Sequence, residues 1–178
     1  MSPNPSIPLA ALPLDRERFL LCLVGELAGT LEEVVGVEET RSYVSLAAQR
    51  LGLGLDTGYR QSLGVSRLSE EQVAQVLVDL KRRIGGQFRV VSRAGDPLVL
   101  ESPACPFGEA VIDRPSMCMM TSNLFGYIAA QNLGYAKVVL EKTLAKRDPV
   151  CRVVVYSKPT AASDAAAGRE YFHVDEPR

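Results

Sequence analysis

Apolar positions in the first part of the chain recur with the period of an α-helix. Asp15 occupies an N-cap position, and the periodic segment after it runs to about Val35. The first predicted helix therefore spans about 15–35. Its apolar stripe consists of Leu20, Leu23, Leu27, Leu31 and Val34.

The first half of this helix is apolar on nearly every side. Besides the residues of the stripe, this half contains four more apolar residues: Phe19, Leu21, Cys22 and Val24. A helix of this kind needs cover on more than one face, and in a small domain a second subunit is a natural source of it. We therefore expect a homodimer that forms through the first helix, with Cys22 packed as a small apolar residue.

Two more helices follow before the period changes. The second is predicted over about 37–51, and we interpret the glycines at 52, 54 and 58 as a turn that ends it, because no strand precedes them as in a nucleotide loop. The third begins with a capping box, Ser69 and Gln72. We interpret its basic residues, Lys81, Arg82 and Arg83, as favourable charges at the carboxyl end of the helix rather than as an anion site.

Beyond residue 88 the pattern becomes that of short strands. Segments 88–92 and 97–101 flank the turn signal 93–96, and segments 135–143 and 150–156 form a second predicted hairpin. A fourth helix, about 116–132, separates the two hairpins. This order predicts an α+β fold in which helices pack against an antiparallel sheet built from two hairpins.

The ends of the chain differ from this central region. Residues 1–13 are rich in proline and nearly uncharged, and we expect a disordered leader there. Residues 157–178 contain an alanine-rich and serine-rich stretch that predicts a flexible tail. The predicted single sensor-type domain is 14–156.

Composition narrows the classes of function. The 178-residue chain has a net charge of −1 and no basic stripe, so we expect no nucleic-acid binding. Its longest apolar run, Phe19 to Val24, is too short to cross a membrane, and no signal-like segment is seen, so we expect a cytoplasmic protein without a membrane partner. In a reducing compartment, cysteines serve as metal ligands, reactive thiols or core residues rather than as disulfides.

Three cysteines carry the candidate chemistry. Cys105 lies in a loop, Cys118 at the start of the fourth helix, and Cys151 on the apolar face of the last strand. These three places can converge on one metal site, although each thiol has an alternative interpretation as a core residue. The fourth ligand is open: the candidates are Cys22, His173, Asp113, a thiol of a partner or an exogenous molecule. We assign no catalytic residue, since no conventional catalytic motif is present.

The C-terminal half resembles a known family. The quoted segments are Cys105-Pro-Phe-Gly, Cys118, Asn123-Leu-Phe-Gly-Tyr, Asn132-Leu-Gly-Tyr-Ala-Lys-Val and Asp148-Pro-Val-Cys151. Over about 103–156 they resemble the methanogen output domain, a relative of the four-vinyl reductase domain. The Cys-Pro-Phe opening is also similar to that of the sensor halves of winged-helix iron–sulfur regulators.

This resemblance implies the fold of TRAPP vesicle-tethering subunits and haem-based nitric oxide sensors, with pairing through N-terminal helices. It implies a metal or iron–sulfur centre on Cys105, Cys118 and Cys151. The four-vinyl reductase pattern has a further cysteine where this chain has Leu144, and no cysteine lies between Cys118 and Cys151. A cubane held by four cysteines of one chain is therefore not implied, and neither is DNA binding, because no winged helix precedes the domain.

Three functional hypotheses follow. The first is a cytoplasmic sensory or regulatory domain that holds zinc or an iron–sulfur cluster on the three cysteines and signals to an unidentified output protein. The second is a metal-free module that binds a small apolar molecule between helices and sheet. The third is a thiol-reactive enzyme that uses a Cys118 thiolate stabilised by the helix N-terminus.

Overall fold

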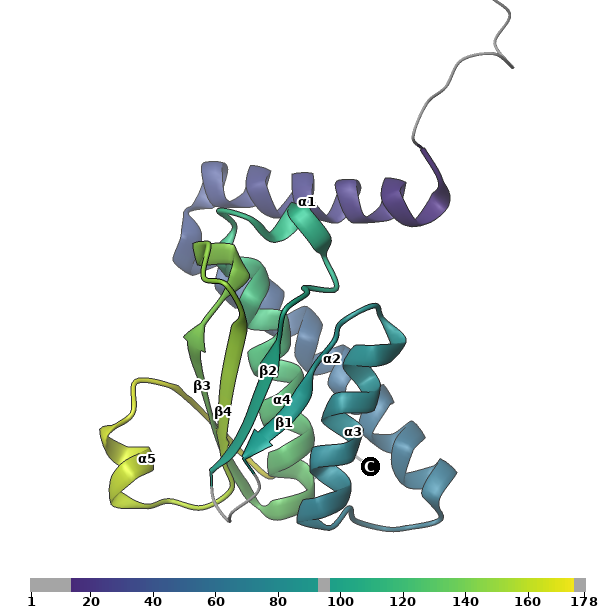
Figure 1. Cartoon of the computed structure of the whole chain (residues 1–178), viewed down its shortest axis with the longest axis vertical. Coiled ribbons are helices and arrows are strands. Elements are labelled where there is room, and N and C mark those ends of the chain that lie inside the picture. The colour runs from purple at the N-terminus through teal and green to yellow at the C-terminus, as the bar shows by residue number, and fades with distance from the viewer. Residues whose placement is uncertain (1–13, 93–96, 175–178) are drawn as a thin grey trace, which may run out of the picture.

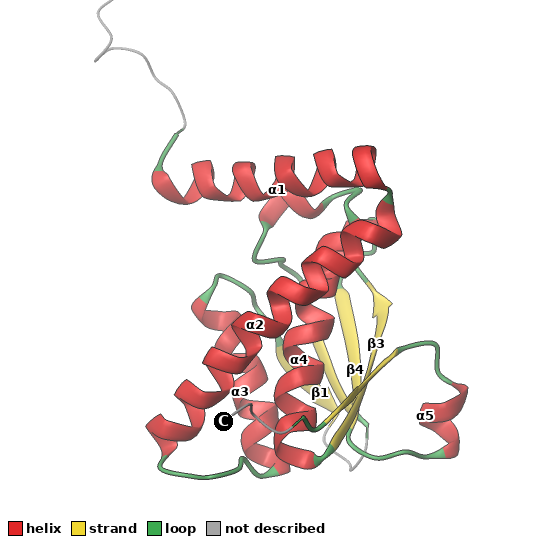
Figure 2. Cartoon of the chain, turned by 180° about the vertical axis from the view of Figure 1, so that it is seen from behind, coloured by secondary structure: helices red, strands yellow, loops and turns green. Residues whose placement is uncertain are grey.

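The protein is an α+β domain with a five-stranded antiparallel sheet, as the sequence predicted. A computed structural model describes residues 14–92 and 97–174. The strand order is β1-β2-β4-β3-β5. Figure 1 shows α4 behind the sheet, α2 behind α4, α3 beside them and α1 across one end of the molecule, and Figure 2 shows the same helices from the opposite side, in front of the sheet. Within the described residues, no helix is long and apolar enough to cross a membrane.

The elements follow the predicted order closely. The helices are α1 (Arg16–Val35), α2 (Val37–Leu63), α3 (Glu70–Arg83), α4 (Cys118–Leu133) and α5 (Ala161–Ala165). The strands are β1 (Arg89–Ser92), β2 (Leu98–Ser102), β3 (Tyr135–Lys142), β4 (Cys151–Tyr156) and β5 (Arg169–Phe172). The predicted turn 93–96 between β1 and β2 and the predicted leader 1–13 lie outside the described residues.

Local signals in the sequence set the ends of several helices. Asp15 caps α1 by accepting a hydrogen bond from the backbone of Arg18, and the capping box of Ser69 and Gln72 starts α3. The two hairpins join through an antiparallel β2–β4 pairing in which Ser102 is opposite Cys151. The sheet is therefore continuous from β1 to β3.

Helix α2 contradicts the predicted turn at its glycines. The helix runs through all three of them and ends at Gly64, which has a left-handed φ of 66°. Gly52 lies against the ring of Tyr127 on α4, so that a β-carbon at position 52 would be 3.1 Å from that ring. Tertiary packing on α4 compensates for the low helix propensity of glycine, which is why the turn prediction was wrong.

The C-terminal segment also differs from the predicted flexible tail. Its described part contains α5 and β5, and β5 pairs with β3 from Tyr135↔Phe172 to Val138↔Arg169. The side chain of Tyr171 lies directly on Gly126 of α4, and its hydroxyl is 2.9 Å from the hydroxyl of Ser122. The tail was predicted from composition alone. Composition does not show that β3 has a free edge with which β5 can pair.

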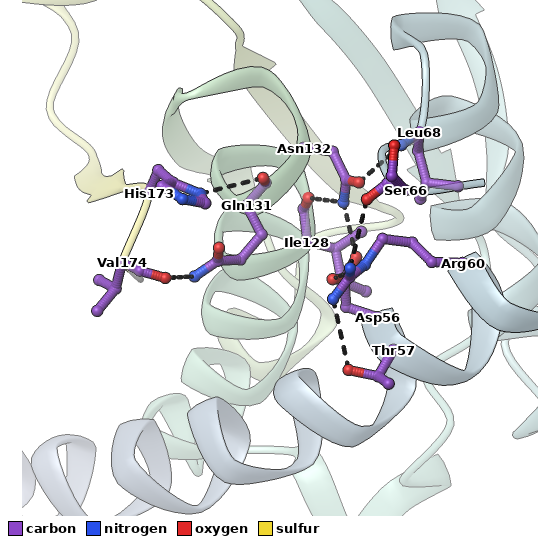
Figure 3. Close-up of polar contacts among 10 residues, drawn as sticks. All are labelled: Asp56, Thr57, Arg60, Ser66, Leu68, Ile128, Gln131, Asn132, His173 and Val174. Carbon is purple, nitrogen blue, oxygen red and sulfur yellow. Dashed lines mark hydrogen bonds and ion pairs between the residues drawn. The ribbon is translucent and has the colours of Figure 1, made fainter. Parts of the chain in front are cut away.

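A polar network holds the far end of α4 in place (Figure 3). Asn132 donates to a carboxylate oxygen of Asp56 at 2.6 Å and accepts from the backbone N–H of Leu68 at 2.7 Å. Gln131 donates to the backbone carbonyl of Val174, and Nδ1 of His173 lies 3.2 Å from the Gln131 carbonyl. Polar groups that are buried and fully paired fix one relative placement of α2, α4 and the C-terminal segment.

Docking of the C-terminal segment can be tested by adding one methyl group to α4. In the Gly126→Ala variant the new β-carbon would be 2.1 Å from the Tyr171 ring, so we expect a loss of roughly 1–3 kcal/mol in the free energy of unfolding. Gly54→Ala is the matched control, because no atom lies within 4 Å of its added β-carbon. That variant should gain up to about 1 kcal/mol from helix propensity. Urea unfolding measures the change in the free energy of unfolding for both variants. If both variants became more stable by the same amount, Tyr171 would not pack against Gly126 of α4.

Candidate thiol centre

Three cysteines from three separate segments line one small cavity. Cys105, Cys118 and Cys151 surround it together with Phe107, Met117 and Thr143. About 20 Å³ of this space is open to the centre of a water-sized sphere, which is room for one water molecule or one ion. We call it the thiol cavity. The predicted convergence of these segments is present in the fold.

Strand pairing brings the first and third cysteines together. Ser102 is the register partner of Cys151, and Cys105 follows Ser102 by three residues. The Ser102 hydroxyl turns the chain by donating to the carbonyl of Ala104 at 2.7 Å and accepting from the backbone of Gln87. The loop therefore returns over the end of β4, and the start of α4 places Cys118 at the same cavity.

Each sulfur has a hydrogen-bond donor or a hydroxyl beside it. The backbone N–H of Leu144 donates to Sγ of Cys151 at 3.4 Å. Burial raises the pKa of Cys105, and the backbone N–H of Phe107 offsets part of that rise by favouring the ionised form. The Thr143 hydroxyl is buried and has no partner in hydrogen-bond geometry among the described residues. Its position beside Cys118 nevertheless favours the ionised form of that thiol, against the larger effect of burial, which raises the pKa. Donors aimed at sulfur are typical of thiolate and metal–thiolate sites.

A buried lysine is the residue that the sequence analysis missed. Lys81 of α3 has no exposed surface, and its Nζ donates to Thr121 Oγ1 at 2.7 Å. The ammonium also faces two aromatic rings, those of Phe88 at 5.7 Å and Phe125 at 5.5 Å. Among the described residues no carboxylate forms an ion pair with it. Burial lowers its pKa to about 8, although the three nearby thiols act in the opposite direction.

The interpretation of this basic cluster as helix-end charges was correct for two of its three members. Arg82 and Arg83 are exposed and bind the carboxylate of Asp79. Lys81 instead lies four residues after Leu77, on the buried side of α3. Its position on the apolar stripe was the available signal, since a lysine there must bury its charge.

Burial shifts the thiols toward their neutral form. The pKa of Cys118 is raised to about 12, and those of Cys105 and Cys151 are also raised, chiefly by desolvation. This direction is opposite to the low pKa expected of a helix-start nucleophile, so it does not favour the enzyme hypothesis. In the described part of the chain, no three His, Cys, Asp or Glu side chains are already close enough to hold an ion.

The proposed fourth ligands are not among the residues that line the thiol cavity. Cys22 is exposed on α1, so its expected burial is wrong for the single chain. Asp113 pairs with Arg147, and His173 contacts Gln131 at the opposite end of α4. The hydroxyl-bearing side chains that line the cavity with Cys118 are those of Thr121 and Thr143.

The order of thiol alkylation tests this burial. With iodoacetamide at pH 8 and no added metal, we expect Cys22 to react first and Cys118 to react at least about tenfold more slowly, since a buried thiol with a raised pKa is almost entirely protonated. Mass spectrometry of peptides after timed quenching measures each rate. Cys118 labelling ahead of Cys22 would instead favour an activated nucleophile.

Comparison with known proteins places the chain in one family. The model of the family described as methanogen output domain 1 matches residues 23–156, which includes most of α1, the thiol cavity and four of the five strands. No curated protein matches the chain. The matched region covers more than half of the sequence and agrees with the family that the cysteine pattern resembles. The chain belongs to the methanogen output domain 1 family.

Proposed function

We propose that this protein is a cytoplasmic sensory or regulatory domain that binds a metal centre through Cys105, Cys118 and Cys151. The observation that carries the proposal is the convergence of three partly buried thiols, from a loop, a helix start and a strand, on one ion-sized cavity. Membership of an output-domain family supports a regulatory role in general terms.

The residues present suit a soft metal ion. Zinc ions and iron–sulfur centres are commonly bound by cysteine thiolates. The hydrogen-bond donors beside the three sulfurs would stabilise the negative charge of these thiolates. The size of the cavity favours a single ion such as zinc over a cluster of several atoms. Since the sulfurs are not gathered closely enough as they stand, binding would draw the loop and the start of α4 together and release the thiol protons to solvent.

Such a movement would act on α1, which rests on the segment that carries two of the cysteines (Figure 1). A β-carbon at Gly25 would be 3.0 Å from that of Ala110, and the carboxylate of Glu32 accepts from the backbone N–H of Ser116 at 3.2 Å. Within α1 only Gly25 and Ala28 are buried. A helix held by so few contacts shifts when its support shifts.

A shared wall gives this coupling a second route. Phe107 and Met117 line the thiol cavity on one side. On the other side they line an open apolar groove of about 290 Å³ between α1 and α2. Rearrangement of these two side chains would alter both spaces at once. Occupancy of the centre is thereby connected to the surface of α1 that a partner would cover.

The partner that we propose for α1 is a second copy of the chain. Leu20, Leu23, Leu27 and Val34 are 43–74% exposed, a long apolar stripe that a single chain leaves uncovered. Arg16 and Arg18 lie near the start of α1, and Glu32 and Glu33 near its end. Because Asp15 and Glu17 lie beside these arginines, the apolar stripe rather than charge pairing would hold an antiparallel pair of α1 helices together. The output protein downstream of such a dimer is not specified by these features.

A metal-free ligand-binding module is the second candidate function. The apolar groove between α1 and α2 favours it, because its volume approaches that of a small-molecule site and its lining is almost wholly hydrophobic. This groove lies between helices rather than between helices and sheet, where the sequence analysis expected a ligand. A co-purified apolar compound without stoichiometric metal would support this function.

Elemental analysis of protein purified without oxygen tests the metal centre. We expect about one zinc per chain, or a broad absorption near ~400 nm with iron and sulfide if a cluster is bound. Single Cys→Ser variants at 105, 118 and 151 should each lose most of the metal. Cys22→Ser is the matched control and should retain it, because Cys22 is exposed and is not among the residues that line the cavity. Equal metal content in all four variants would reject the site.

Light scattering during gel filtration tests the dimer. Leu23→Glu places a charge in the middle of the α1 stripe and should weaken dimerisation by at least about tenfold. Leu63→Glu at the end of α2 is the control, since Leu63 is as exposed as Leu20 but lies outside α1. A monomeric wild-type protein at high micromolar concentration, or an unchanged dimer in the Leu23 variant, would contradict this partner.

A further inference from the structure

The ammonium of Lys81 is a buried charge without a counter-ion among the described residues. It has three N–H donors, and one of them is satisfied, by Thr121 Oγ1. Aromatic rings attract a cation but do not neutralise it. An unpaired charge in the interior is among the costliest features that a fold can contain, so its place next to three thiols calls for a physical reason.

The hydrogen-bond partner of this charge lies at the thiol cavity, because Thr121 is one of the residues that line it. Thr121 follows Cys118 by three residues, so the anchor of the ammonium and the Cys118 thiol share one side of α4. Gly86 lets the loop approach from the other side: its β-carbon would be 3.1 Å from Pro106 and 3.4 Å from the β-carbon of Lys81. Ionised thiols at all three cysteines would raise the pKa of Lys81 and so favour its charged form.

The charges of a metal–thiolate complex supply the missing partner. If three S–H groups lost their protons to solvent and bound a divalent ion whose fourth ligand is neutral, such as water, the complex would carry a net charge of −1. One lysine brings the buried group to neutrality. The same three thiolates around a monovalent ion would carry 1 − 3 = −2 and leave one negative charge uncompensated.

We propose that Lys81 is the built-in counter-cation of the thiol centre and makes it selective for complexes of net charge −1, which are those of a divalent ion on Cys105, Cys118 and Cys151. This inference rests on the proposed function and adds to it the charge class of the metal. Lys81 is a positioning and selectivity residue, since it contacts Thr121 and two rings rather than the ion.

The proposal predicts two effects of opposite sign for Lys81→Met, which keeps the length of the side chain and removes its charge. Without metal, the variant should be more stable than the wild type, with a thermal midpoint about 2–4 °C higher, because the uncompensated buried charge is gone. With zinc, its affinity should fall by about 10–100-fold, as for other residues that support metal ligands.

The experiment measures both quantities on the full chain, using zinc alone as the probe. Thermal unfolding in the presence of a chelator gives the metal-free midpoint, and competition with a chromophoric chelator gives the zinc affinity. Lys146→Met removes the same charge from an exposed position in the β3–β4 turn and should change neither. Lys81→Gln, which keeps a donor for Thr121, is the second variant and should show the same loss of zinc affinity if Lys81→Met does not fold.

The outcomes separate this inference from the function on which it rests. Zinc affinity that is unchanged in both Lys81 variants but lost in Cys151→Ser would overturn the role of Lys81 and leave the metal centre intact. Wild-type protein and Cys151→Ser with the same weak zinc affinity would overturn the metal centre, and the counter-cation with it. A loss confined to the Lys81 and cysteine variants, with a higher metal-free midpoint for Lys81→Met, supports the proposal.

Discussion

The burial of most of helix α4 is the constraint on which the rest of the structure depends. Leu124, Phe125, Ile128 and Ala129 are almost without exposed surface, so the helix must be covered on every side. The sheet covers one side, α2 and α3 cover others, and β5 completes the enclosure through Tyr171 on Gly126. Because such a helix is rigid, the position of one end determines the position of the other. Its first turn carries Cys118 and Thr121, and its last carries the amides that fix α2 and the C-terminal segment.

The thiol cavity lies where two cores meet. Cys151 packs against the main core under the sheet, whereas Cys105 and Cys118 pack against a smaller cluster that includes Ala28 of α1 and Met117. A site at such a junction responds to the relative placement of both parts, and chemistry at the site can in turn bias that placement. This location gives the proposed regulatory role a physical basis, since the smaller cluster is also the support of α1.

Electrostatics and packing oppose each other in this region. Burial raises the pKa of Cys118 and lowers that of Lys81, and the Lys81 ammonium has no carboxylate partner among the described residues. The hydrogen bond to the Cys151 sulfur and the aromatic rings around Lys81 reduce the free-energy cost of this burial, but they do not neutralise the charge. Local conflicts of this kind, in an otherwise consistent fold, are expected at functional sites rather than in the structural core.

The sequence by itself determined the elements whose signals are local. The N-cap of α1, the capping box and period of α3, the alternation in β3 and the turn residues predicted most boundaries and the α+β class. The cysteine spacing predicted which thiols to consider. Tertiary structure alone decided the features that depend on distant partners. Glycines became part of α2 because Tyr127 packs on one of them, and an apparent tail became β5 because β3 offered a free edge. Lys81 lies inward because Thr121 and two aromatic rings contact its ammonium. In each case the deciding contact joins residues far apart in the chain, and no local pattern encodes it.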